Sequence, residues 1–217
     1  MSAVLSKQEA MSSEQPVKRK RGRPVQDANE GLRQALLDQS AKLFREKGYG
    51  NTTVRDIAAA TGIHAGSWFY HFKTKHDILA AVVELGLTRA IDDIEVIGVD
   101  QLPPREALLR LIHQHLHTLL GPDQDYIPVM LYEWRSLDAD AKLRIVGLQD
   151  RYEAIWDKVI ARLHESGEWA MPTRLDRLLM FGALNWCAKW YKPDAGDDLA
   201  ALAETALQFI LRTPAGP

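Results

Sequence analysis

Apolar side chains recur at every third or fourth position along most of this chain, and polar side chains fill the positions between them. This spacing places apolar residues on one face of an α-helix, whereas a half-buried strand would alternate apolar and polar residues. The segments that carry helical spacing are 29–47, 53–60, 65–71, 75–97, 105–120, 126–134, 139–166, 173–191 and 196–212. No alternating segment is found, so we predict an all-α protein with about nine helices.

Two of the predicted helix starts carry a capping box, in which a hydroxyl and an acid three residues later bond each other's backbone N–H groups. The pairs are Thr53 with Asp56 and Thr74 with Asp77. The helix that starts at Thr53 ends before Gly62, because glycine adopts the positive φ of a tight turn without a steric clash. Two short helices joined by such a turn form a helix-turn-helix, which DNA-binding proteins place in the major groove.

The second short helix of this unit has an inner and an outer side. Trp68 and Phe72 are four residues apart and are expected to face the core with Ile57. The other side chains of the helix are then available to DNA. We expect groove contacts from His64, Ser67, Phe69, Tyr70 and His71. We expect phosphate contacts from Thr52, Thr53, Arg55, Tyr70 and Lys75, helped by the positive ends of the short helices.

This segment resembles the DNA-binding domain of TetR/AcrR-type repressors over about residues 32–79. The matching positions are Phe44, Gly48-Tyr49, Thr52-Thr53-Val54, Ile57-Ala58, Gly62-Ile63, Gly66-Ser67, Tyr70-His71-Phe72 and Lys73-Thr74-Lys75. The chain departs from the family at His64, where Ser or Thr is common, and at Ala65, where Lys is common. It also has Trp68-Phe69 where Leu-Tyr is common. The missing Lys removes one phosphate contact and bears on base preference.

Length and helix pattern extend the resemblance to the whole chain of 217 residues. We expect an N-terminal helix-turn-helix domain with three helices, followed by a helical ligand-binding and dimerisation domain. The expected parts are a disordered basic arm (1–29), the DNA-binding domain (30–76, called the head below), the second domain (77–212, called the body below) and a tail (213–217). The resemblance implies a homodimer in which the last two helices of each subunit form a four-helix bundle.

Charge is distributed unevenly along the chain. Residues 1–76 hold 13 Lys and Arg against 7 Asp and Glu, whereas residues 77–217 hold 14 against 22. A basic end on an acidic body is expected where only one end meets nucleic acid. The single cysteine, Cys187, excludes an internal disulfide and indicates a reducing compartment. No apolar run is long enough to span a membrane, so we expect a cytoplasmic protein.

The basic arm contains the run Lys18-Arg19-Lys20-Arg21-Gly22-Arg23-Pro24. One interpretation is a solvated tail that increases solubility. The other is a similarity to an AT-hook, in which Arg21 and Arg23 enter a narrow minor groove. The neighbouring helix-turn-helix favours the second interpretation, and each phosphate contact made by the arm would steepen the salt dependence of DNA binding.

The body carries aromatic and basic side chains of the kind that line ligand pockets. We expect ligand contacts from Tyr126, Trp134, Arg135, Trp186, Lys189 and Trp190. The alternative is that these aromatic residues are ordinary core. The stretch around Trp186 resembles the corresponding helix of TetR-type regulators that sense CoA thioesters, which implies a hydrophobic anionic effector. His113 and His117 have the spacing of a metal pair but lack further ligands, so we predict no metal.

The chain contains no G-x-S-x-G, P-loop or Rossmann glycine pattern, and we predict neither an enzyme nor a cofactor. These observations favour a homodimeric, ligand-responsive transcriptional regulator of double-stranded DNA. The simplest form is a repressor that a small molecule releases from a palindromic operator. Two alternatives stay open. One is a helical ligand-binding or enzyme domain whose head no longer binds DNA, and the other is a DNA architectural protein without an effector.

Overall fold

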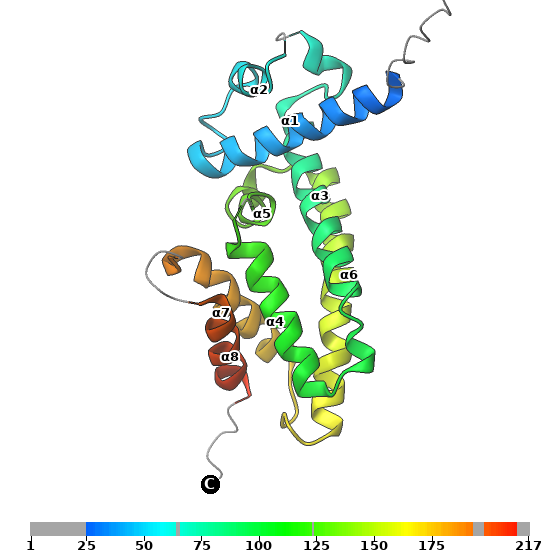
Figure 1. Cartoon of the computed structure of the whole chain (residues 1–217), viewed down its shortest axis with the longest axis vertical. Coiled ribbons are helices and arrows are strands. Elements are labelled where there is room, and N and C mark those ends of the chain that lie inside the picture. The colour runs from blue at the N-terminus through cyan, green and yellow to red at the C-terminus, as the bar shows by residue number, and fades with distance from the viewer. Residues whose placement is uncertain (1–24, 64–65, 123, 193–197, 212–217) are drawn as a thin grey trace, which may run out of the picture.

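The computed structural model describes residues 25–63, 66–122, 124–192 and 198–211 (Figure 1). Over these residues the chain forms eight α-helices and three short 3-10 helices and contains no strand, which confirms the predicted all-α fold. The α-helices are α1 (Val25–Lys47), α2 (Val54–Thr61), α3 (Lys75–Glu95), α4 (Pro104–Leu120), α5 (Tyr126–Glu133), α6 (Ala139–Glu165), α7 (Arg174–Trp190) and α8 (Leu199–Ile210). The 3-10 helices are η1 (Ser67–Tyr70), η2 (Val99–Gln101) and η3 (Trp134–Ser136).

Helix α1 begins earlier than the sequence predicts. It starts at Val25, inside the segment expected to be a disordered arm that ends at residue 29. Residues 25–29 contain neither glycine nor proline, so no residue there opposes extension of the helix. The rest of the arm, including Arg21 and Arg23, lies outside the described residues.

One helix of the head differs in form from the prediction. The prediction of an α-helix over residues 65–71 is wrong, because the helical part of this segment that the structure describes is the four-residue 3-10 helix η1. Gly66 precedes η1 without a side-chain cap, and the aromatic residues that follow have lower helix propensity than Ala or Leu. The inner side is nonetheless the expected one, since Trp68 and Phe72 are both buried.

Side-chain caps fix the helix starts on either side of η1, as the sequence predicts. Thr53 Oγ1 accepts the N–H of Asp56, whose carboxylate accepts the N–H of Thr53 in return. Thr74 and Asp77 form the same reciprocal pair at the start of α3. Gly62 ends α2 with a φ of 69°. These caps and this turn determine how the chain enters and leaves the segment from α2 to η1.

The body is organised around α4. In Figure 1 the helices α3 and α6 run side by side along one flank of α4, and α7 and α8 lie on the other. Helix α4 packs against all four of them, and Trp156 of α6 is fully buried in the resulting core. Among the helices described, none combines the length and the apolar content that crossing a bilayer would require.

Candidate functional site

Two aromatic side chains of η1 point out of the head. Phe69 is 60% exposed and Tyr70 is 90% exposed, although their neighbours Trp68 and Phe72 are buried. The short helix therefore sorts its aromatic residues between the core and an outer surface. An exposed pair of aromatic rings on a basic domain is suited to stacking and hydrogen bonding with another molecule.

The residues that the sequence assigns to DNA contact fall into two groups. Thr53, Arg55, Phe69 and Tyr70 are exposed, and His71 is half-buried. Thr52 is buried, and its hydroxyl donates to the carbonyls of Leu43 and Gly48 at 3.2 and 2.9 Å. His64 lies outside the described residues, as do Arg21 and Arg23, and only the backbone of Ser67 is described.

Lys75 is occupied within the head. Its Nζ donates to the carbonyls of Tyr49 and Thr52, each at 2.8 Å, and lies 4.1 Å from the centre of the Tyr49 ring. Two hydrogen bonds and one cation–π contact from this ammonium hold the loop after α1 against the start of α3. Lys75 and Thr52 thus brace the head from within, whereas Thr53 and Arg55 lie on its outer side.

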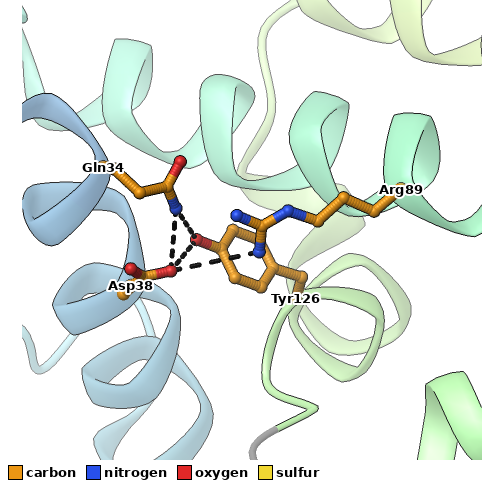
Figure 2. A network of polar contacts seen from close by, with 4 residues as sticks. All are labelled: Gln34, Asp38, Arg89 and Tyr126. Atoms are coloured by element: carbon orange, nitrogen blue, oxygen red, sulfur yellow. Dashed lines mark hydrogen bonds and ion pairs between the residues drawn. The ribbon is translucent and has the colours of Figure 1, made fainter. Parts of the chain in front are cut away.

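The head and the body meet at the start of α5. Tyr126 donates its hydroxyl to Asp38 of α1 at 2.5 Å and accepts a hydrogen bond from Gln34 of α1 at 3.1 Å. Arg89 of α3 lies 4.8 Å from the centre of the Tyr126 ring and 4.0 Å from the Asp38 carboxylate (Figure 2). Burial, with the neighbouring Asp38 carboxylate, raises the pKa of Tyr126, which therefore stays protonated and able to donate.

Further bonds tie both ends of α5 to the head. Arg45 donates to the carboxylate of Asp125 at 2.8 Å, just before α5. At the other end of the helix, Glu133 accepts the backbone N–H of Tyr49 at 2.9 Å. Helix α5 therefore belongs to the body by sequence but is held to the head at each end.

Helix α5 also approaches α3 closely. A Cβ added at Gly86 of α3 would lie 2.7 Å from the Cβ of Tyr126, which is closer than two carbon atoms can pack. Only glycine permits this approach without a shift of one helix. The geometry places Tyr126 directly against the backbone of α3 on one side and against α1 on the other.

A cavity of about 110 Å³ lies inside the body. Residues from five helices line it: Leu87, Ala90, His115, Thr118, Ile127, Met130, Gln149, Tyr152, Glu153, Phe181 and Asn185. Two of these, Ile127 and Met130, belong to α5, so the helix held to the head also forms part of the cavity wall. A cavity with a mostly apolar lining and a few converging polar groups is the usual form of a small-molecule site.

His115 is the central polar residue of this cavity. Its Nδ1 lies 3.0 Å from the Tyr152 hydroxyl and its Nε2 lies 3.1 Å from Oδ1 of Asn185. Burial lowers the pKa of His115 to about 4, and the hydrogen bond to Asn185 opposes this only in part. The imidazole is therefore neutral at neutral pH.

None of the six residues that the sequence assigns to ligand contact lines this cavity. Tyr126 lies at the junction of head and body, and Trp134 and Arg135 lie in η3. Trp186 is 64% exposed and Trp190 is 49% exposed. Lys189 lies 4.1 Å from the centre of the Tyr132 ring, outside the cavity.

The sequence pattern assigned no ligand contact to His115, Tyr152 or Asn185, which are three of the polar residues that line the cavity. One signal was available for His115, because it falls in the same apolar stripe as Leu111 and Leu119, which are both buried. A polar residue in such a stripe must find a hydrogen-bond partner in the core. No pattern indicates that its partners come from α6 and α7.

A further surface on α7 and α8 is apolar and exposed. It includes Leu175, Leu178, Leu179, Trp186, Trp190 and Phe209. Residues of both helices also line a surface hollow of about 630 Å³, which includes Leu178, Leu179 and Phe209. Large contiguous apolar patches of this kind mark interaction sites on proteins.

Comparisons with known proteins match both parts of the chain. Residues 36–82 match the family model of bacterial regulatory proteins of the tetR family, and residues 101–213 match the tetracyclin repressor-like C-terminal domain. The HTH-type transcriptional repressor KstR2 of Mycolicibacterium smegmatis is 42% identical, with 82% of this chain and 88% of that protein covered. KstR2 of Rhodococcus jostii is 29% identical, with 86% and 93% covered.

The fold is also found among solved structures. The transcriptional regulator FadR from Bacillus subtilis, solved in complex with stearoyl-CoA, superposes with a TM-score of 0.69 at 25% identity. The match covers 82% of this chain and 97% of that one. The similarity therefore extends over the head and the body together.

Proposed function

Since the chain belongs to the TetR family of bacterial regulatory proteins, we propose that it is a homodimeric repressor that releases a palindromic operator when a small molecule binds its body. The observation that carries this proposal is the outward position of Phe69 and Tyr70 on η1, next to capped helix starts that hold η1 in place. Relatives with this family's two domains are transcriptional regulators and not enzymes.

In the proposed complex the outer side of the head meets DNA. The residues proposed for the groove are His64, Ser67, Phe69, Tyr70 and His71, and those for phosphate are Thr53, Arg55 and Tyr70, with Arg21 and Arg23 of the arm. Thr52 and Lys75 act indirectly in this proposal, because their polar atoms already bond backbone carbonyls of the head. They would keep the exposed residues in position.

The exposed apolar face of α7 and α8 supports a second copy of the chain as the partner. Packing these two helices against their equivalents would form a four-helix bundle and remove Leu179 and Trp186 from water. A two-fold dimer would present two heads to successive major grooves, about 34–36 Å apart. That spacing explains the palindromic operator in the proposal.

We assign the effector to the cavity beneath α5. A CoA thioester or another hydrophobic anionic metabolite is the proposed class, with its apolar part inside the cavity. The apolar lining, which includes Leu87, Met130 and Phe181, supports this assignment. The stearoyl-CoA complex of FadR, a related protein, supports the same class.

Helix α5 supplies the proposed connection between effector and operator. Its residues Ile127 and Met130 line the cavity, while Tyr126 and Glu133 bond the head. A ligand that fits better when α5 is displaced would favour a different spacing of the two heads. A 100-fold preference for that state supplies about 2.7 kcal/mol, which is enough to weaken operator binding substantially.

Operator binding by the full chain tests this function. Replacing Tyr70 and His71 by Ala is expected to weaken binding to the chain's own upstream DNA by about 100-fold, because two outer contacts are lost. The dimer, measured by sedimentation, is expected to stay intact. Val96→Ala is the matched control, since Val96 is 87% exposed at the far end of α3.

The same measurement separates the proposal from its alternatives. Unchanged operator binding by the double variant would refute the assignment of η1. No binding by the wild-type chain at any tested DNA would favour a ligand-binding or enzyme domain with an inactive head. Binding that no small molecule weakens would favour an architectural protein.

A further inference from the structure

The hydrogen bonds around His115 have directions that follow from their chemistry. A neutral imidazole has one N–H donor and one acceptor nitrogen. Oδ1 of Asn185 is an acceptor, so Nε2 of His115 carries the hydrogen and donates to it at 3.1 Å. Nδ1 is then the acceptor, and the hydroxyl of Tyr152 donates to it at 3.0 Å. Burial maintains this neutral state, as it lowers the pKa of His115 to about 4.

The chain of hydrogen bonds from Tyr152 through His115 to Asn185, called the His115 relay below, fixes the orientation of the Asn185 amide. Its oxygen is engaged by His115, which leaves the Nδ2 group with two N–H donors. Asn185 lines the cavity, and within the described residues its nitrogen makes no hydrogen bond. A donor that lines an otherwise mostly apolar cavity is suited to a ligand that supplies an acceptor.

The other polar groups of the cavity wall are already engaged. Thr118 donates its hydroxyl to the carbonyl of Gln114 at 2.9 Å, and Gln149 directs Nε2 to the sulfur of Met130 at 3.8 Å. The Glu153 carboxylate lies 3.2 Å from a guanidinium nitrogen of Arg177. Asn185 is therefore the residue of the wall with both side-chain N–H donors available, whereas Gln149 keeps only one.

The charge of the wall excludes an anionic group from the cavity. Neither Lys nor Arg is among the lining residues, the imidazole is neutral, and Glu153 contributes the one carboxylate. A carboxylate or phosphate placed there would lose its hydration without gaining a cationic partner. The charged part of an amphiphilic effector would have to stay outside.

We infer that the cavity selects an uncharged carbonyl group on an apolar skeleton, such as a ketone, ester or thioester, and that Asn185 donates to its oxygen. The inference rests on the proposed function, in which this cavity holds the effector. Its volume of about 110 Å³ suits a part of the ligand about the size of one ring. His115 is the positioning residue, because it orients the amide through its bond to Oδ1 of Asn185.

Three probes with the same six-membered ring test this inference on the full chain. They are cyclohexanone, methylenecyclohexane, which lacks the oxygen, and cyclohexanecarboxylate, with affinities measured by ligand-observed NMR at pH 7.5. Cyclohexanone is expected to bind roughly fivefold more tightly than methylenecyclohexane, the gain from one net hydrogen bond. Cyclohexanecarboxylate is expected to bind at least about tenfold more weakly than cyclohexanone.

Two substitutions at one position assign the preference to Asn185. Asn185→Leu removes both N–H donors, and Asn185→Asp keeps an acceptor for His115 while removing the donors. Both are expected to abolish the preference for the ketone over methylenecyclohexane. Leu87→Ile, a change in the apolar part of the wall at a side chain that makes no hydrogen bond, is expected to keep it.

Several results would overturn the inference. These are a carboxylate that binds as well as the ketone, a preference that survives both Asn185 variants, and a wild-type chain that binds none of the probes. Operator binding is measured on the same preparations, so that a failure of this inference can be distinguished from a failure of the proposed function. A chain that selects the ketone but never binds DNA would refute the regulator and leave the cavity assignment standing.

Discussion

The buried polar side chains of the head and the buried His115 of the body find their hydrogen-bond partners at very different distances along the chain. In the head, Ser40 donates to the carbonyl of Leu36, four residues away, and Thr52 bonds carbonyls four and nine residues away. In the body, His115 bonds Tyr152 and Asn185, which are 37 and 70 residues away and belong to two other helices. The buried hydroxyls of the head are bonded locally, as is that of Thr118 in the cavity wall, whereas His115 bonds two other helices.

The buried hydroxyls of the head are therefore satisfied by nearby residues, whereas the central polar group of the body depends on how its helices pack. Local bonds form whenever their own segment is folded, so the bonds of Ser40 and Thr52 do not depend on how the body packs. The His115 relay exists only while α4, α6 and α7 keep their relative positions. In the proposed function, a ligand that changes those positions would act on the body first and reach the head through α5.

The largest expected effect is the pH dependence of stability that arises from the buried His115 of the body. An unfolded histidine has a pKa of 6.5 and the buried His115 one of about 4, so between these values the unfolded chain binds more protons. Stability should therefore fall as pH decreases from about 6.5 to about 4, by about 3 kcal/mol in total. Urea unfolding at a series of pH values measures this loss.

His115→Gln supplies the control, since glutamine keeps polar bonding capacity without titrating. The variant is expected to lose this part of the pH dependence. Hydrogen bonds from Thr53 and Thr173 hold the pKa values of Asp56 and Asp176 below the ordinary 3.8, and the loss of stability that these groups add below about pH 5 is the same in both proteins. An equal loss of stability in both proteins would show that His115 is not the group responsible.

A smaller effect is expected from the buried hydroxyl of the head. Thr52→Val keeps the shape of the side chain but leaves the carbonyls of Leu43 and Gly48 without this donor. We expect a loss of about 1–2 kcal/mol in the free energy of unfolding, with ligand-probe affinities in the body unchanged. A change in those affinities would contradict the view that the polar groups of the head act locally.

The smallest expected effect concerns a threonine helix cap that occurs in both the head and the body. Thr53 caps α2 in the head and Thr173 caps α7 in the body, each with an acid three residues later. Replacing either by Ala is expected to cost about 1 kcal/mol of stability, measured by thermal unfolding. Only Thr53→Ala is expected to weaken operator binding as well. A loss of operator binding from Thr173→Ala would remove this distinction between the regions.

The sequence is informative where structure depends on neighbouring residues. The capping boxes at Thr53 and Thr74 and the turn at Gly62 were all predictable, because each involves side chains within a few positions of the backbone that they bond. The helix type of η1 was not predictable, since the sequence from Gly66 to Tyr70 permits both an α-helix and a 3-10 helix. Packing of Trp68 against the head decides between such short forms.

The cavity shows where sequence reasoning fails for a physical reason. Trp186 and Trp190 have the composition of a ligand pocket, yet the rotation of α7 turns them to the surface and directs Asn185 to the cavity. That rotation depends on contacts of α7 with α4, far away in the sequence. Composition therefore indicated a helix that lines the cavity, but not the residues of that helix that line it.

The glycine at the crossing of α3 and α5 has a mechanical consequence. Side chains between packed helices normally absorb displacements below an ångström by rotating about their χ angles. Gly86 has no side chain, and Tyr126 rests directly on the backbone of α3. A displacement of α5 toward α3 would therefore meet the backbone of α3 directly, with no side chain between them at this point to absorb it.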